Sequence, residues 1–207
     1  MSVISNQNFY FGSGSMSNTY PVAKYTVLQN GDTDISHTMD LSHAYDGVIR
    51  IKSEAMANAF YKCTGITNVK FPNLVIVESN GLNGAFCYCT SLTNASFPKL
   101  ITIESRGLNS IFLNCTSLTS VYFPELVTVG SQGLQSAFSN CTSLTSVYFP
   151  KLTSIQSSSL TSMFNNCTGI TDIHFNSNAQ STIEALTGYG GYSSNFGASN
   201  ATIYFDL

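Results

Sequence analysis

A strict 26-residue repeat is the feature that most constrains the fold of this chain. Five cysteines fall at this interval, and the apolar residues around them keep the same spacing. The repeated positions are Cys63, Cys89, Cys115, Cys141 and Cys167; Phe60, Phe86, Phe112, Phe138 and Phe164; Ile66, Leu92, Leu118, Leu144 and Ile170; and Phe71, Phe97, Phe123, Phe149 and Phe175. A unit of this length cannot cover its own apolar side chains, whereas stacked units bury them in continuous columns. The period therefore predicts a solenoid in which each repeat forms one coil.

Each unit predicts three short elements. Residues 118–124 alternate apolar and polar side chains, as in a strand with one buried face, and Pro124 closes the strand. Residues 126–129 are a candidate for a second short strand. Leu134, Ala137 and Phe138 have the i, i+3, i+4 spacing of one or two helical turns. We therefore expect a β-rich solenoid with one short helical turn per coil, about five repeats and a cap at each end.

The repeat carries a resemblance to a known family. The pattern Phe-x-x-Cys-Thr-Ser-Leu-Thr-x-x-x-Phe-Pro-x-Leu resembles the BspA-like leucine-rich repeats, also called the Treponema pallidum type, over about residues 46–176. The resemblance implies a leucine-rich-repeat horseshoe or arc. It also implies a binding scaffold, since the family is associated with bacterial surface adhesins, with host-protein binding and with some protist and phage proteins.

The two ends of the chain depart from the repeat. Residues 48–62 fit the second half of a unit, whereas residues 1–44 do not repeat, which favours an N-terminal cap. The alternative for this segment is attachment to a partner or to sister chains through Phe9, Tyr10 and Phe11. At the other end we expect a helical turn at 182–186, a glycine loop at 189–192 and a strand at 202–205. The offset of this strand from the preceding one is longer than the 26-residue period. The predicted domains are residues 1–44, 45–176 and 177–207.

Composition narrows the classes of partner. Only 9% of the residues are charged and the net charge is −3, so a basic footprint for nucleic acid or an anionic membrane is not expected. The chain has no apolar stretch long enough to span a membrane, and residues 1–20 lack the pattern of a signal peptide. We expect no membrane insertion and an extracellular or cell-surface location, with a virion component as the alternative.

The regular spacing of the cysteines favours a packing role for them over disulfide formation, metal binding or catalysis. Matching positions of stacked coils lie about 4.8 Å apart, which permits disulfides by distance, but ladder side chains point in parallel and five cannot pair completely. Buried free thiols with weak S–H hydrogen bonds are the better interpretation. Cys87-x-Cys89 lacks a second pair, and His37, His43 and His174 show no matching spacing. We therefore expect no metal, no cofactor and no catalytic residues, so that the protein is not an enzyme.

The alternation of the first strand predicts two rows of outward side chains. The first outward row is Lys70, Ser96, Tyr122, Tyr148, His174 and Tyr204, and the second is Asn68, Asn94, Ser120, Ser146, Asp172 and Thr202. Tyrosines with small hydroxyl and amide groups are typical of binding surfaces, although outward tyrosines also suit strands without any ligand. We expect a recognition or adhesion module that binds a protein or a glycan through these rows. The alternative is a structural subunit, such as a virion decoration or fibre protein, attached through its non-repeating ends.

Overall fold

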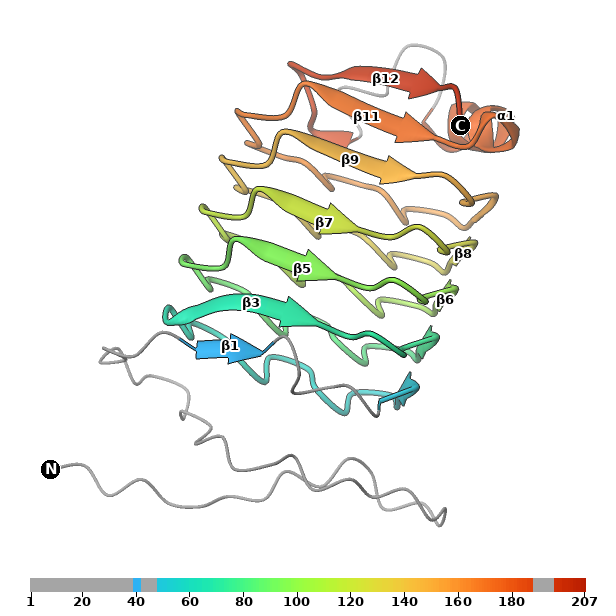
Figure 1. The fold of residues 1–207 in the computed structure, drawn as a ribbon. Helices are drawn as coiled ribbons and strands as arrows, with labels where there is room; N and C mark the ends of the chain where they lie inside the picture. Colours follow the sequence, from blue (N-terminus) through green and yellow to red (C-terminus); the bar gives the residue numbers. More distant parts are fainter. Residues whose placement is uncertain (1–38, 42–47, 188–195) are drawn as a thin grey trace, which may run out of the picture.

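The computed structural model describes residues 39–41, 48–187 and 196–207, which form a stack of parallel coils (Figure 1). The stack confirms the predicted solenoid, in which each coil rises onto the next along one axis. Several expectations lie outside the described residues. They are the cap or attachment role of residues 1–38 and 42–47, including Phe9, Tyr10 and Phe11, and the loop at 189–192.

The strands predicted by the alternating pattern line one side of the stack (Figure 1). One parallel sheet has the order β1 (Met39–Leu41), β3 (Ile66–Lys70), β5 (Asn94–Ser96) and β7 (Ser120–Tyr122). Beyond β7 a second parallel sheet continues with β9 (Ser146–Phe149), β11 (Asp172–Phe175) and β12 (Thr202–Phe205). Ala95 is paired with Val121, one repeat later, and Asp172 is paired with Thr202, which confirms the longer offset predicted for the last strand. We call the outward surface of β3, β5, β7, β9, β11 and β12 the strand face.

The second short strand of each unit is also confirmed. A parallel sheet contains β2 (Arg50–Ile51), β4 (Ile76–Val77), β6 (Thr102–Ile103), β8 (Thr128–Val129) and β10 (Ser154–Ile155) in this spatial order. Strand β2 pairs with β4 in the register of the repeat, with Arg50 opposite Ile76. Residues 48–62 therefore form the second half of a first coil, as the sequence predicts.

The prediction of a helical turn in each coil is wrong. Residues 131–140 form a run of successive turns in which Gln132, Ser136 and Asn140 have positive φ angles of 57°, 52° and 61°. The N–H of Ala137 donates to the carbonyl of Leu134, at 3.1 Å, but the N–H of Ser136 donates to Thr161 of the next coil, at 3.0 Å. A helix would use each of these N–H groups within its own segment. The neighbouring coil supplies competing acceptors, so the chain keeps the inward spacing of its apolar residues without forming a helix.

A regular helix appears only at the C-terminal end of the described solenoid. A short 3-10 turn, η1 (Ser177–Ala179), leads into α1 (Gln180–Thr187), which confirms the helix predicted at 182–186. Asn176, which stands where earlier units have proline, accepts a hydrogen bond from the N–H of Asn178 and donates one to the carbonyl of Pro150. The Asn side chain therefore ends the repeat pattern and caps the turn that begins the helix.

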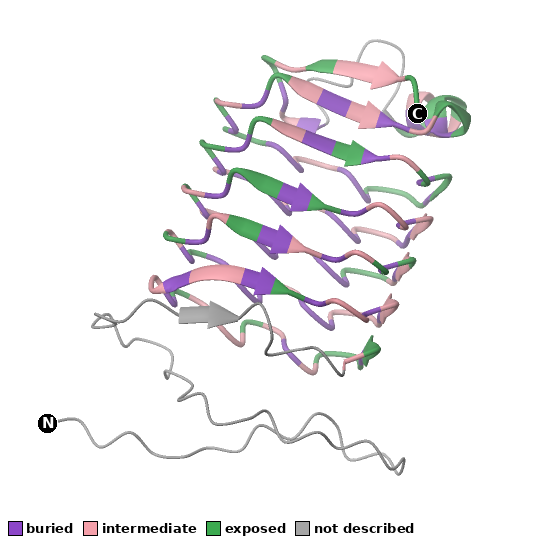
Figure 2. Cartoon of the chain, viewed as in Figure 1, coloured by how far each residue is buried: buried purple, intermediate pink, exposed green. Residues whose placement is uncertain are grey.

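The core consists of stacked phenylalanine columns that run along the solenoid. Phe97 stacks on Phe123 at 5.1 Å between ring centroids, and Phe112 stacks on Phe138 at 5.9 Å. These side chains are fully buried. Figure 2 shows buried residues between exposed or intermediate ones along β3, β5, β7, β9 and β11, whereas β12 at the C-terminal end has no buried residue. The columns explain why the apolar positions of the repeat keep their spacing.

Substitutions at two neighbouring residues of one coil test which side chains face the core and which face outward. Replacing the buried Phe123 with Ala removes a ring from the core column, and we expect the free energy of unfolding to fall by about 3–5 kcal/mol. Replacing the adjacent, outward Tyr122 with Ala should change it by about 0.5 kcal/mol or less. Urea titration followed by circular dichroism measures both. Equal destabilisation by the two substitutions would contradict the assignment of inward and outward faces.

Candidate binding site on the strand face

The structure brings the predicted residues of the strand face together in two rows, each of which runs across two successive sheets. Lys70 is paired with Ser96 and Ser96 with Tyr122 across β3, β5 and β7. His174 is paired with Tyr148 on one side and with Tyr204 on the other, across β9, β11 and β12. The second outward row has the same register. Tyr122 and Tyr148 are the most open of the rings, with exposed fractions of 57% and 46%. Both rows therefore lie on one surface, and their role in binding stays a prediction.

The N-terminal half of the second outward row is held by hydrogen bonds between coils. The side-chain amide of Asn94 donates to Oδ1 of Asn68 at 3.2 Å, and the hydroxyl of Ser120 donates to Oδ1 of Asn94 at 2.9 Å. Beside this row, the hydroxyl of Thr119 donates to the carbonyl of Thr93 at 3.0 Å. These bonds order the polar side chains before any ligand arrives, which lowers the entropy that binding would cost.

The C-terminal half of the first row forms a ring stack. The ring of His174 lies between those of Tyr148 and Tyr204, with centroid distances of 4.6 and 4.5 Å and interplanar angles of 10°. Parallel strands in register place matching residues about 4.8 Å apart, which is close to the stacking distance of aromatic rings. The stack is therefore a direct consequence of having aromatic residues at the same position in three successive strands.

Asp206 is a residue of this surface that the sequence analysis did not single out. Its Oδ1 and Oδ2 atoms lie 2.9 and 3.3 Å from Nδ1 of His174. The alternation rule could have found it, because Asp206 follows Tyr204 by two residues and so shares its face. On the other side of the stack, Oδ2 of Asp172 accepts a hydrogen bond from the hydroxyl of Thr171 at 2.7 Å. Two carboxylates therefore flank the rings.

The cysteine column is buried inside the coils, away from the strand face. All six cysteines are free and buried, which confirms the interpretation of the column as buried free cysteines. The thiol of Cys115 donates to the carbonyl of Phe86 at 3.1 Å, and that of Cys141 donates to Phe112 at 3.1 Å. Each of these thiols thereby links its coil to the previous one. The weak S–H hydrogen bonds predicted from the sequence are present.

Burial controls the acidity of these thiols. Desolvation raises the pKa of Cys63 and of Cys87 to about 11 and that of Cys167 to about 12. For Cys115 and Cys141, desolvation and then the neighbouring thiol of the column hold the pKa well above its usual range. Nucleophilic and metal-binding cysteines require the thiolate, which these sites disfavour. Among the described residues, no three His, Cys, Asp or Glu side chains are grouped so as to hold a metal ion.

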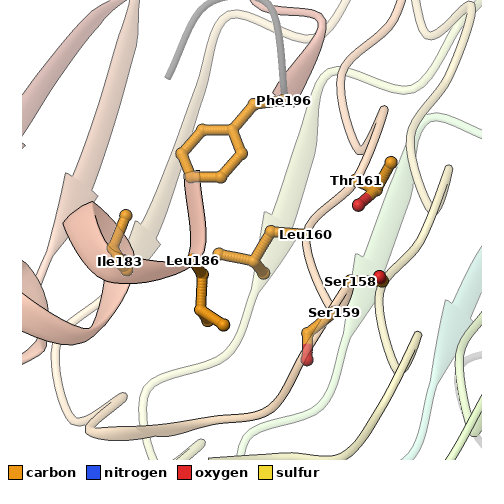
Figure 3. Close-up of a pocket in the computed structure, with 7 residues that line it drawn as sticks. All are labelled: Ser158, Ser159, Leu160, Thr161, Ile183, Leu186 and Phe196. Carbon is orange, nitrogen blue, oxygen red and sulfur yellow. The ribbon is translucent and has the colours of Figure 1, made fainter. Parts of the chain in front are cut away.

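A small pocket lies at the C-terminal end, between the last run of turns and α1 (Figure 3). It has a volume of about 80 Å³. Its lining side chains carry no charge; they are Ser158, Ser159, Leu160, Thr161, Ile183, Leu186 and Phe196. The pocket is apart from the two outward rows, and it brings together no acid, base or strong ligand group for a metal.

Stacked parallel coils with a repeated strand face define a leucine-rich-repeat type of solenoid. The model of the BspA type leucine rich repeat region matches residues 53–187 in six copies, so the chain belongs to this family. The resemblance seen in the sequence is thereby confirmed. The match begins in the half coil before Cys63 and ends within α1, so its six copies take in both ends of the array that the sequence analysis counted as about five repeats.

The chain is also similar to a solved structure, that of a leucine rich cell surface protein from Faecalibacterium prausnitzii A2-165. The two are 22% identical, with a TM-score of 0.45, over 68% of this chain and 32% of that one. This chain therefore spans about a third of the length of that protein. No curated protein matches the chain. Among the described residues, no helix combines the length and apolar character that a membrane crossing requires.

The raised pKa values predict slow thiol chemistry in the folded protein. At pH 8 we expect Cys115 and Cys141 to react with Ellman's reagent at least about 100-fold more slowly than in 6 M guanidinium chloride, where all six thiols are open. Mass spectrometry of the labelled peptides identifies each site. Rapid labelling of Cys115 or Cys141 while circular dichroism shows an intact fold would contradict their placement in the core.

The same shifts predict the direction of alkaline destabilisation. A folded-state pKa above the unfolded value of 9.0 means that the folded chain holds more thiol protons than the unfolded chain above that pH. The stabilisation is therefore complete below about pH 9 and is lost as the pH rises towards the folded-state pKa values. Urea midpoints measured from pH 7 to pH 10.5 should fall above pH 9. A Cys115→Ala/Cys141→Ala variant should show a smaller decline.

Proposed function

We propose that this protein is a non-catalytic recognition or adhesion module that binds a protein or a glycan through its strand face. The observation that carries the proposal is the open row of rings, in which Tyr122 and Tyr148 lead into the stack of His174 and Tyr204. Tyrosine offers a large contact area at a low entropic cost because it has only two rotatable side-chain bonds. Exposed aromatic residues on a rigid surface are typical of binding sites.

The scaffold supports this function in two ways. Its strands are fixed by parallel pairing and by the phenylalanine columns, so the outward side chains sit on a sheet whose backbone is held from coil to coil. The strict positions of the repeat face the core, whereas the first outward row changes from lysine and serine to rings along the axis. A ligand that spans several coils would therefore meet a varied surface on a regular frame.

An extracellular or cell-surface location forms part of the proposal. Only 9% of the residues in the whole chain are charged, so the solubility of the solenoid depends on hydroxyl and amide groups. Such a surface composition is more common outside cells. The family to which the chain belongs is associated with surface adhesins. We infer that the protein displays its strand face to a partner outside the cell or on the surface of a particle.

The proposal is tested by a binding screen with matched tyrosine variants. The full chain is applied to an array of extracellular-matrix proteins and to a glycan array, together with a Tyr122→Ala/Tyr148→Ala variant. The control, Tyr61→Ala/Tyr88→Ala, removes two tyrosines from the run of turns, where the two rings contact each other at 5.5 Å. For any ligand of the wild type, the strand-face variant should weaken the affinity by about tenfold or more, while the control stays within twofold.

Two outcomes would overturn the assignment of the strand face. One is an unchanged affinity of the Tyr122→Ala/Tyr148→Ala variant for the ligand found on the array. The other is an equal loss in the Tyr61→Ala/Tyr88→Ala control, which would place the binding surface elsewhere or show a general effect on folding. The alternative function is a structural subunit that assembles through its ends. Light scattering tests it by comparing the oligomeric state of the full chain with that of a chain lacking residues 1–44.

A further inference from the structure

We propose that the C-terminal half of the strand face binds the cationic side chains, arginine above all, of an extended protein segment. This inference rests on the proposed function and names the chemistry of its ligand. The aromatic–carboxylate site, as we call it, joins a ring row to two flanking acids; its members are Tyr122, Tyr148, His174, Tyr204, Asp172 and Asp206. The rings supply faces and edges for a planar cation, and the carboxylates supply its counter-charge.

The arrangement of the site follows from strand geometry. Asp172 precedes His174 by two residues in β11, and Asp206 follows Tyr204 by two residues at the end of β12. A two-residue step along a strand is about 6.6 Å, so the backbone positions of Asp172 and Asp206 lie about that far from the ring row, on opposite sides of it. Asp206 contacts His174 directly. The ring row therefore runs between two acids.

The partners of the two carboxylates indicate what charge a ligand of this site would carry. Within the part of the chain that the structure describes, neither Asp172 nor Asp206 forms an ion pair with lysine or arginine, and the partner of Asp206 is His174. Lys151, the basic residue nearest in sequence, has its ammonium 2.6 Å from Glu125. Lys70 belongs to the same outward row but lies four repeats before His174. The surface is thus complementary to a positively charged partner.

One ring of the row has a face that no other ring of the described structure covers. One face of Tyr148 is covered by His174. Tyr122, one repeat earlier, is 57% exposed, and its ring is not stacked on that of Tyr148 in the described structure. A guanidinium group stacks on an aromatic face and at the same time donates paired hydrogen bonds to a carboxylate. The uncovered side of Tyr148 is turned towards β7 and offers a ring face, whereas Asp172 lies in β11, on the side that His174 covers, so different cationic side chains of one extended segment would reach the ring and the carboxylates. A neutral sugar would use the ring face but would gain nothing from the two negative charges.

The experiment uses the full chain and a defined probe. The probe is a fluorescein-labelled octapeptide of alternating Arg and Ser, blocked at both ends, and binding is followed by fluorescence anisotropy. Matched peptides replace Arg by citrulline, which keeps the shape without the charge, or by Glu; unlabelled chitohexaose serves as the neutral glycan. We expect the Arg peptide to bind at least about tenfold more tightly than the citrulline and Glu peptides, and more weakly as salt is raised from about 20 to about 300 mM.

Variants connect this affinity to the site. Asp172→Asn and Asp206→Asn should each weaken binding of the Arg peptide by about fivefold, and Tyr148→Ala by about the same factor. Glu54→Gln, an exposed acid in the first half coil, is the matched control and should leave the affinity within twofold. Equal binding of the Arg and citrulline peptides, or an unchanged affinity of both Asn variants, would overturn the inference. Absence of binding by the Arg peptide would overturn it as well.

The outcomes separate this inference from the proposed function. Suppose that the array ligand depends on Tyr122 and Tyr148 while the Arg peptide does not bind. The strand face then remains the binding surface, and its ligand is not cationic. Tight binding of chitohexaose that is unaffected by Asp172→Asn and Asp206→Asn would assign a neutral glycan instead. The converse result is also possible: the Arg peptide binds and depends on the site, while the array ligand binds the Tyr122→Ala/Tyr148→Ala variant as tightly as the wild type. That result would refute the proposed function and leave this inference standing.

Discussion

Hydrogen bonding from coil to coil is the constraint on which the rest of this structure depends. Parallel strands pair on two sides of the stack, and in every run of turns before the last one every second N–H donates to the following coil. These bonds form only when equivalent backbone atoms of neighbouring coils lie opposite one another. The length of the repeat therefore cannot vary between coils that pair along their whole length. The longer step to β12 keeps its register, since the additional residues fall between the strands, where α1 begins.

Stacking also determines where chemistry is possible. It places the thiols in a buried column, in which a carbonyl of the previous coil accepts each S–H from Cys89 onwards and desolvation opposes formation of the thiolate. The most regular residues are therefore structural. The residues that vary from coil to coil lie on the strand face, and there the same spacing that aligns the core brings aromatic side chains into contact. One geometry thus produces both an inert interior and an ordered surface.

The candidate site was predictable in part. Alternation along a strand places Tyr122 outward and Val121 inward, and the period then assigns every member of both rows to one surface. The ring stack and the contact between Asp206 and His174 were not predicted, because they depend on side-chain rotamers and on the pairing of β11 with β12 across an irregular connection. Likewise, the apolar spacing of residues 134–138 fits a helix and a run of turns equally, and only the acceptors of the next coil decide between them.

The sequence by itself determined the solenoid, the two strands of each coil, the phenylalanine columns and the free state of the cysteines. These features follow from a period and from the need to bury apolar surface, both of which are visible in one dimension. The tertiary structure alone decided that alternate N–H groups bond between coils, that three rings stack at 4.5 to 4.6 Å, and that two carboxylates flank them. Such contacts join residues that lie a whole repeat apart in the chain, so they exist only once neighbouring coils have come into register.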